Sequence, residues 1–268
     1  MSNWNTKSGS SAKNEGADAM KYCLIADFHT HTRYSHGKGT IEQNVLMARQ
    51  KGLRKIAIAD HGFNHFGFGM RIDDIPRVRE EIEYLNEKYH DIDILFGIEA
   101  NLIGLDGEID IPEKYIDAFD IILVGFHKAV IPFSVKDGWR LFIRNAFYRV
   151  LPQREKERIR YDNTIAMVRA MERYPIHTIT HPGAKIDIDT RILAKHAAKH
   201  NVFLEINSSH GFMTTEYVKT AMDEGAYFVI NSDAHKPEQI GDMSKGIAIA
   251  KKAGVPSDRI ANSQDFVQ

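Results

Sequence analysis

The sequence predicts one α/β domain in which seven parallel strands form a barrel. Short apolar runs alternate with longer amphipathic runs through most of the 268 residues, which is typical of parallel strands joined by helices. A chain of this length suits a single barrel domain. By strand count alone an open doubly wound sheet fits equally well. The barrel is favoured because a polar group able to bind or orient a metal follows each apolar run. A barrel brings these strand ends to one face, whereas an open sheet spreads them along a line.

The strands are expected in short runs that are rich in Val, Ile and Leu. Each run has four to seven residues, which is the length of a buried strand and too short for a helix. The helices between them imply parallel strands with right-handed crossovers. The expected strands are residues 22–26, 55–59, 92–98, 121–125, 177–180, 202–206 and 227–230.

The helices are expected where apolar residues recur every three or four positions. Ile41, Val45 and Ala48 share one face of such a segment, which ends at Gly52. Between the third strand and the fourth, a Gly-Leu-Asp-Gly turn at residues 104–107 predicts a small excursion. The expected helices are residues 41–51, 76–89, 112–119, 163–173, 189–200, 214–224 and 244–253.

Two segments depart from the alternation of strands and helices. Residues 1–20 are polar and lack the apolar run of a signal peptide, so we expect a disordered tail before a barrel domain at 21–268. A basic insert occupies about residues 130–160, with an amphipathic helix expected over 139–151. This helix either packs its aromatic face on the domain or forms a lid over the site, or a surface for a partner or anionic lipid.

The composition excludes several classes of function. The 35 Lys and Arg are balanced by 36 Asp and Glu, so no nucleic acid partner is expected. No apolar run approaches the roughly 18 residues of a transmembrane segment, and a cytoplasmic location is expected. The single cysteine, Cys23, is expected as a small core residue of the first strand. It excludes a disulfide framework and a thiolate zinc cage within one chain. No sequence pattern specifies an oligomeric state.

The 13 histidines are the informative feature of the composition. Seven of them fall just after strand ends, together with one glutamate and one aspartate. Two of these histidines are two positions apart, so their imidazoles point to the same side of a strand. Imidazole and carboxylate ligands without a thiolate suit zinc, manganese or iron. The nine candidate ligands are His29, His31, His36, His61, Glu99, His127, His181, Asp233 and His235.

Nine ligands are enough for two or three divalent ions, and a carboxylate at position 99 is the better candidate to bridge two of them. Closely spaced ions favour the hydrolysis of phosphate esters, because they stabilise both the attacking and the leaving oxygen. Cations directly after the ligand motifs are candidates to hold phosphate, and acids beside ligand histidines are candidates to orient them. The candidate catalytic residues are Glu99, Asp233 and His235, the phosphate-binding candidates are Arg33, Lys128 and Lys185, and the orienting candidates are Asp27 and Asp60.

The other six histidines do not share this placement. His65 and His210 lie in loops after the second and sixth strands, where either a structural role or a place beside the substrate is open. His196 and His200 have the i,i+4 spacing of a helical metal site, but no acid lies near them in the sequence, so they are expected at the surface. His90 and His177 are expected to have surface and structural roles, respectively.

The strand-end motifs resemble those of the PHP (polymerase and histidinol phosphatase) family. The resemblance spans about residues 22 to 265, and the nine candidate ligands match the family's metal ligands. It implies a distorted (β/α)7, TIM-like barrel with a trinuclear site. By this resemblance His29, His31 and Asp233 hold one ion, Glu99 bridges it to a second held by His127 and His181, and His36, His61 and His235 hold the third. The motifs are His29-Thr-His31 with Ser35-His36, Ala59-Asp-His-Gly62, Gly97-Ile-Glu-Ala-Asn101, Gly125-Phe-His127, Thr180-His-Pro-Gly183 and Asn231-Ser-Asp-Ala-His235.

The expected activity is metal-dependent hydrolysis of a small phosphate monoester, with a metal-bound hydroxide attacking phosphorus in line. Two alternatives stay open. Amidohydrolases also use a His-x-His pair and a late Asp, and Lys128 is a candidate for their bridging carboxylated lysine, although Glu99, His36 and His61 would be surplus. An inert PHP module with a structural or binding role is expected to have lost ligands, and none of the nine is missing here.

Overall fold

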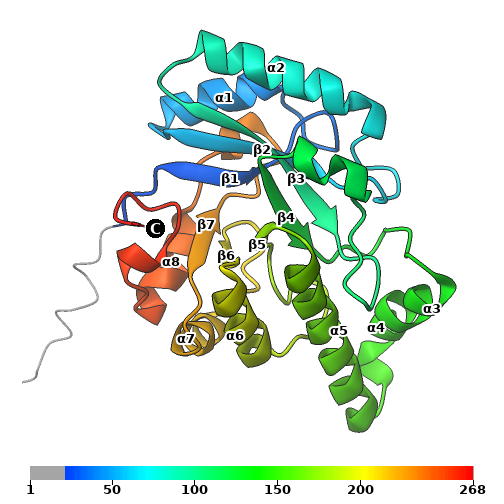
Figure 1. Cartoon of the computed structure of the whole chain (residues 1–268). Helices are drawn as coiled ribbons and strands as arrows, with labels where there is room; N and C mark the ends of the chain where they lie inside the picture. The colour runs from blue at the N-terminus through cyan, green and yellow to red at the C-terminus, as the bar shows by residue number, and fades with distance from the viewer. Residues whose placement is uncertain (1–21, 268) are drawn as a thin grey trace, which may run out of the picture.

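The computed structural model describes residues 22–267 and shows seven parallel strands, paired in sequence order, that form a nearly closed barrel (Figure 1). The predicted fold class is therefore confirmed. The tail expected over residues 1–20 lies outside the described residues. The strands are β1 (Ala26–Thr30), β2 (Lys55–His61), β3 (Asp93–Asn101), β4 (Ile121–Gly125), β5 (Ile176–Ile179), β6 (Phe203–Asn207) and β7 (Phe228–Asn231).

Helices surround the strands, and their apolar faces bury the main core against the outer face of the barrel (Figure 1). Thr40 begins the first helix in a capping box with Gln43, and Asp189 caps the sixth through the amide of Ile192. The segment expected as a helix over 112–119 is 3₁₀-helical at Glu113–Ala118. No helix within residues 22–267 is both long and apolar enough to cross a bilayer. The α-helices are α1 (Ile41–Gln50), α2 (Ile75–Lys88), α3 (Val135–Asp137), α4 (Arg144–Ala146), α5 (Gln153–Arg173), α6 (Thr190–His200), α7 (Thr215–Asp223) and α8 (Ser244–Ala253).

Side-chain amides complete the barrel where β1 meets β7. The Asn262 side chain donates to the carbonyls of Ala26 (2.8 Å) and Ile230 (2.6 Å) and accepts from the Ile230 amide. The Asn231 side chain accepts from the amide of Phe28 at 3.0 Å. The C-terminal segment thus takes the place of part of a strand ladder, which is why the barrel departs from regular closure.

The inward face of the barrel changes character along the strands. At their amino ends it is apolar, and Phe28, Phe203 and Val229 belong to one small buried cluster. Two residues further along β6 and β7 the inward positions are Glu205 and Asn231, both fully buried and polar. The carboxyl end of the barrel is therefore a buried polar site on an apolar floor.

The first strand begins four residues later than predicted. Residues 22–26 were expected to form it, whereas β1 starts at Ala26 and includes His29. Cys23 therefore precedes the strand and is exposed, with its thiol 3.3 Å from Oε1 of Gln264, so its predicted place in the core is wrong.

The basic insert is not one helix. The segment expected as a helix over 139–151 consists of π-helical Gly138–Ile143, the short α4 and a 3₁₀ turn at Tyr148–Val150, outside the ring of helices and beside α5 (Figure 1). Leu141 is fully buried and the ring of Phe142 stacks on Phe126 at 5.2 Å, whereas Trp139 and Phe147 are exposed. The predicted aromatic contact with the domain thus involves only part of this segment. Residues 153–160 form the first turns of α5.

His177 makes folding stability depend on pH. Its ring packs edge-on against Phe28 and Phe203 (centroid distances 5.3 and 5.0 Å), and burial lowers its pKa to about 4. In the unfolded chain this histidine is protonated below about pH 6.5, whereas in the folded chain it is protonated only below about pH 4. The free energy of unfolding therefore decreases as the pH falls through this window. Between pH 7.5 and 5 we expect the free energy of unfolding to decrease by about 2 kcal/mol less in His177→Leu than in the wild type. Urea unfolding of both proteins across this range measures the difference, and parallel pH profiles would contradict it.

Candidate metal centre

The nine candidate ligands lie together at the carboxyl end of the barrel. They line or adjoin a cavity of about 570 Å³ that is also bordered by His65, His210 and Lys185. The ring of His65 stacks on that of His61 at 5.0 Å, and Nε2 of His210 is 3.3 Å from Oδ2 of Asp233. The structure thus places the two loop histidines beside the ligands, where a substrate would contact them.

Glu99 is at the centre of this group. The fully buried carboxylate is offered by β3, and the imidazoles around it come from β1, β2 and the ends of β4 and β5. Burial alone would raise the pKa of Glu99, but its electrostatic interactions with the imidazoles of His127, His29 and His61 outweigh the burial and hold the pKa well below its ordinary value. Oε2 is 2.8 Å from Nδ1 of His61, 3.3 Å from Nε2 of His29 and 3.8 Å from Nε2 of His31, and Oε1 is 2.8 Å from Nε2 of His181 and 3.4 Å from Nε2 of His127.

Asp233 is the second carboxylate of the centre. Its Oδ1 is 3.3 Å from Nε2 of His31, 3.6 Å from Nε2 of His29 and 3.5 Å from Nδ1 of His235. Burial would raise its pKa, and the charge of His29 together with the close contact of the His31 ring lowers the pKa instead. Asp233 is therefore ionised at neutral pH, as a metal ligand must be.

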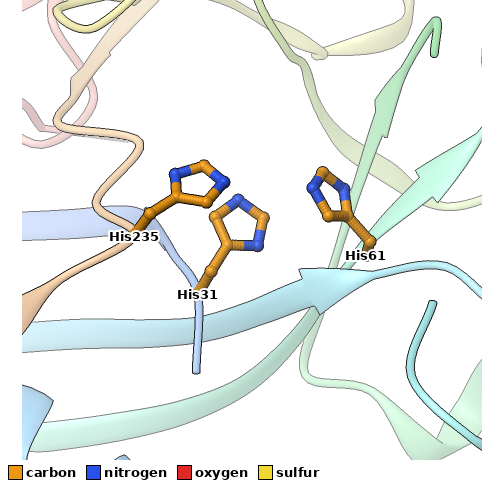
Figure 2. A group of neighbouring side chains, drawn as sticks. All are labelled: His31, His61 and His235. Carbon is orange, nitrogen blue, oxygen red and sulfur yellow. The ribbon is translucent and has the colours of Figure 1, made fainter. Parts of the chain in front are cut away.

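Within this cluster, three groups of side chains have the spacing of metal sites. In each group the potential ligand atoms lie within 4.8 Å of one another. Figure 2 shows one of them, formed by His31, His61 and His235, which come from three different strands or strand ends. The other two groups are His29, His31 and Asp233, and His61, Glu99 and His127.

The grouping differs in part from the one that the family resemblance implies. The group of His29, His31 and Asp233 is the same. In the group of Figure 2, His31 takes the place that the resemblance gives to His36. The ring of His36 lies 4.8 Å from that of His61 and 4.2 Å from that of His235. The nine side chains thus form one continuous cluster in which neighbouring groups share histidines.

The unpaired polar atoms of the cluster fit divalent ions. Nε2 of His29, both ring nitrogens of His31, Nδ1 of His61 and Oε2 of Glu99 are buried and have no well-aligned hydrogen bond within the protein. Such atoms are costly unless a ligand satisfies them. Burial, aided by His235 and His61, lowers the pKa of His36 to about 4. Burial also lowers the pKa of His127 to about 3, so both rings are neutral at pH 7 and free to bind a metal.

Two ligands have left-handed backbone conformations. The φ angles of His181 and Asp233 are 29° and 54°, in the turns after β5 and β7. Such angles are uncommon for residues other than glycine and persist where the surroundings hold the backbone. The amide of His181 donates to Oε2 of Glu205 at 2.7 Å, which fixes one of these turns.

Glu205 and Asn101 orient ligand imidazoles, and neither was among the candidate site residues. Oε1 of Glu205 is 2.8 Å from Nδ1 of His29, and Oδ1 of Asn101 is 2.7 Å from Nδ1 of His127. These contacts leave Nε2 of each ring directed at Glu99. The signal in the sequence was weak: an acid inside the apolar run 202–206, and an asparagine two residues after a candidate ligand.

The two acids predicted to orient ligands bind neighbouring loop residues and do not bind the ligand imidazoles themselves. The Asp60 carboxylate accepts from the amide and hydroxyl of Thr32 (2.7 and 2.5 Å) and from the Ser35 hydroxyl, which are in the loop between His31 and His36. The Asp27 carboxylate accepts from the Ser232 hydroxyl (2.5 Å) and from the Gly241 amide. These two acids therefore hold the loops that carry ligands.

The three predicted phosphate-binding cations separate in the structure. Lys185 borders the cavity of the metal centre, and Lys128 is exposed on the wall of an adjoining cavity. Arg33 is exposed and lines neither of these two cavities. Of the three, Lys185 alone is placed to reach a group bound at the metal centre.

Glu205→Gln is expected to lower kcat/KM about 10- to 100-fold at limiting metal, with partial recovery when metal is in excess. The amide keeps the size of the side chain but loses the charge that holds the His29 imidazole. Metal titrations of hydrolytic activity measure the effect, and Glu87→Gln, at an exposed acid on α2, is the matched control. An unchanged metal dependence would contradict the orienting role.

Comparisons with known proteins give a family match, sequence relatives and a similar fold. A family model described as the PHP domain matches residues 27–232. A protein of Tolumonas auensis named "Probable phosphatase" is 33% identical over 258 residues, covering 91% of this chain and 90% of that protein. "Probable phosphatase YcdX" of Escherichia coli is 32% identical over 253 residues, covering 88% of this chain and 89% of that protein. In fold, the chain is similar to histidinol phosphate phosphatase of Lactococcus lactis, solved with zinc, L-histidinol and phosphate, with a TM-score of 0.60 at 16% identity, covering 87% of this chain and 94% of that chain.

Proposed function

The chain belongs to the PHP family, and from that premise we propose that it is a metal-dependent phosphomonoesterase whose centre holds two or three divalent ions. The observation that carries the proposal is the buried Glu99 carboxylate, which lies within 4 Å of a ring nitrogen of five histidines. Ions bound there supply Lewis-acid chemistry and lower the pKa of coordinated water. Zinc, manganese and iron all suit this set of imidazoles and carboxylates.

The ligand assignment follows the family resemblance, and the grouping of the side chains supports its first ion. His29, His31 and Asp233 would hold one ion, and Glu99 with His127 and His181 would hold a second. His61 and His235, with His36 beside them, would hold the third. Glu99, Asp233 and His235 border the space where a phosphate would react.

The residues around the cavity position a phosphomonoester. Lys185 donates to a phosphate oxygen from one side of the cavity, and the exposed Lys38 and Lys236 border it from another. His65 and His210 border the ester group. We propose a small phosphorylated molecule as the substrate and the cytoplasm as the location.

The amidohydrolase alternative is disfavoured by the position of Lys128. A carboxylated lysine would have to lie between two ions, where Glu99 lies instead, and Lys128 is exposed on the adjoining cavity. None of the nine ligands has been lost, as would be expected of an inert module.

The test is hydrolysis of p-nitrophenyl phosphate by protein loaded separately with zinc, manganese and iron. A lactone and an anilide are assayed in parallel, and bound metal is measured for each preparation. We expect turnover of the phosphate ester alone. Absence of phosphate ester turnover in protein with at least two bound ions per chain would refute the proposal.

A further inference from the structure

A second cavity adjoins the metal centre and carries an unbalanced positive charge. It has a volume of about 810 Å³, and Lys185 lines both it and the metal cavity. Its walls come from the insert, the loop after β5 and the loop after β6. Each of the two cavities exceeds what a phosphate group fills and is within the range of small-molecule sites.

Three cations line this second cavity without a carboxylate partner. Among the ion pairs and hydrogen bonds of residues 22–267, none joins the side chain of Lys128, Arg149 or Lys185 to an acid. The one acid on the wall, Asp187, accepts a hydrogen bond from the Tyr148 hydroxyl.

Most arginines of the insert and of the first part of α5 are paired with acids. Four of the six in residues 130–160 pair with carboxylates at 2.8 to 3.3 Å, and the two without such a pair are Arg149 and Arg154. Arg149 lines the cavity, as do Phe212 and Tyr217. The paired arginines are Arg140, Arg144, Arg158 and Arg160.

We propose that the second cavity binds a second anionic group of the substrate, so that the preferred substrates are small phosphate monoesters with a further phosphate or carboxylate. The inference rests on the proposed phosphomonoesterase function. Lys185 lies between the two anions, Lys128 and Arg149 bind the distal one, and the insert supplies this recognition. Charge-assisted hydrogen bonds of this kind add both affinity and geometric selectivity.

Matched pairs of substrates test the proposal. Glycerol 3-phosphate is compared with 3-phosphoglycerate, and glucose 6-phosphate with glucose 1,6-bisphosphate, on the metal-loaded enzyme. We expect at least a tenfold higher kcat/KM for the member with two anionic groups in one pair or both, expressed mainly in KM. A preference in the glycerol pair alone would identify the distal group as a carboxylate, and a preference in the glucose pair alone would identify it as a phosphate.

Arg149→Gln supplies the second arm, with Arg154→Gln as the matched control, because Arg154 is also exposed but lies outside the cavity wall. Arg149→Gln is expected to remove most of the preference for the second anion and to leave p-nitrophenyl phosphate hydrolysis unchanged. Equal kcat/KM within both pairs in the wild type, or equal losses of kcat/KM on all substrates in Arg149→Gln, would overturn the inference. Absence of p-nitrophenyl phosphate hydrolysis in the metal-loaded wild type would instead refute the proposed function.

A separate cluster on the opposite face of the barrel has the composition of a metal site. His196 and His200 are one turn apart on α6, and Glu172 near the end of α5 supplies the acid that the sequence does not place near them. The potential ligand atoms of the three residues lie within 4.8 Å of one another, and the two rings are parallel to within 7°. Nδ1 of His196 and Nε2 of His200 are buried and have no hydrogen-bond partner.

We infer that Glu172, His196 and His200 bind one zinc-type ion that joins α5 to α6. Two imidazoles and one carboxylate are a common zinc ligand set. The negative end of the α6 dipole also favours a cation beside His200. The site is independent of the catalytic centre, because α6 ends at the amino-terminal side of the barrel.

Zinc stoichiometry tests this second site. After equilibration with micromolar Zn²⁺ and gel filtration, wild-type protein is expected to retain one ion per chain more than His200→Gln or Glu172→Gln, with equal p-nitrophenyl phosphate activity in all three. His90→Gln, which changes an exposed histidine elsewhere, is the control and should retain the wild-type content. Equal zinc contents in all four folded proteins would overturn the inference.

Discussion

Glu99→Gln is expected to lower kcat/KM for p-nitrophenyl phosphate by about three orders of magnitude, which corresponds to about 4 kcal/mol. The glutamine amide has nearly the same shape but carries no charge, and its NH₂ group would face imidazole nitrogens at distances of 2.8 to 3.8 Å. The space around the carboxylate is tight, since a Cβ atom added at Gly125 would lie 3.1 Å from Oε1 of Glu99. The charge that unites the centre is therefore lost without replacement.

Metal content separates this effect from a general loss of structure. Glu99→Gln should retain fewer ions per chain than the wild type, and its far-ultraviolet circular dichroism should be unchanged. Glu113→Gln, at an exposed acid, should match the wild type in both activity and metal content. Wild-type kcat/KM in Glu99→Gln would show that the carboxylate does not bridge ions.

The strand count and order could be predicted because parallel strands buried on both faces are continuous apolar runs. The boundaries could not, because the carboxyl ends of several strands are polar. In β1 the buried Asp27 and Thr30 satisfy their polar groups inside the fold, the latter by donating to the carbonyl of Ala57 at 2.7 Å. The pattern of apolar residues in the sequence does not reveal buried polar residues whose hydrogen bonds are made inside the fold. The first strand was therefore predicted to begin four residues too early.

The candidate ligands could be predicted because their positions after strand ends depend only on barrel topology. Contacts between elements distant in sequence could not be predicted. Glu205 meets His29 across 176 positions of the chain, and Glu172 meets His196 only because α5 packs on α6. The insert shows the same limit, since its composition indicated a helix but not its breaks or its contribution to a cavity wall.

Removal of metal is expected to abolish activity and to destabilise the fold. A chelator followed by gel filtration should reduce p-nitrophenyl phosphate hydrolysis to the uncatalysed rate, because the proposed nucleophile is a water molecule that the ions activate. Ions present at about a thousand times their Kd stabilise a protein by about 4 kcal/mol. For a chain of this size that corresponds to a decrease in Tm of roughly 10 °C on metal removal.

Stepwise return of metal makes the experiment specific to this centre. Activity should remain low after the first equivalent of zinc, manganese or iron and rise with the second or third, because the three ligand groups share His31 and His61. The Glu172→Gln protein serves as the control for ions bound outside the barrel mouth and should recover activity with fewer added equivalents. Full activity in protein with less than one ion per ten chains would contradict a metal-dependent reaction, whereas full recovery at one equivalent would reduce the centre to a single catalytic ion.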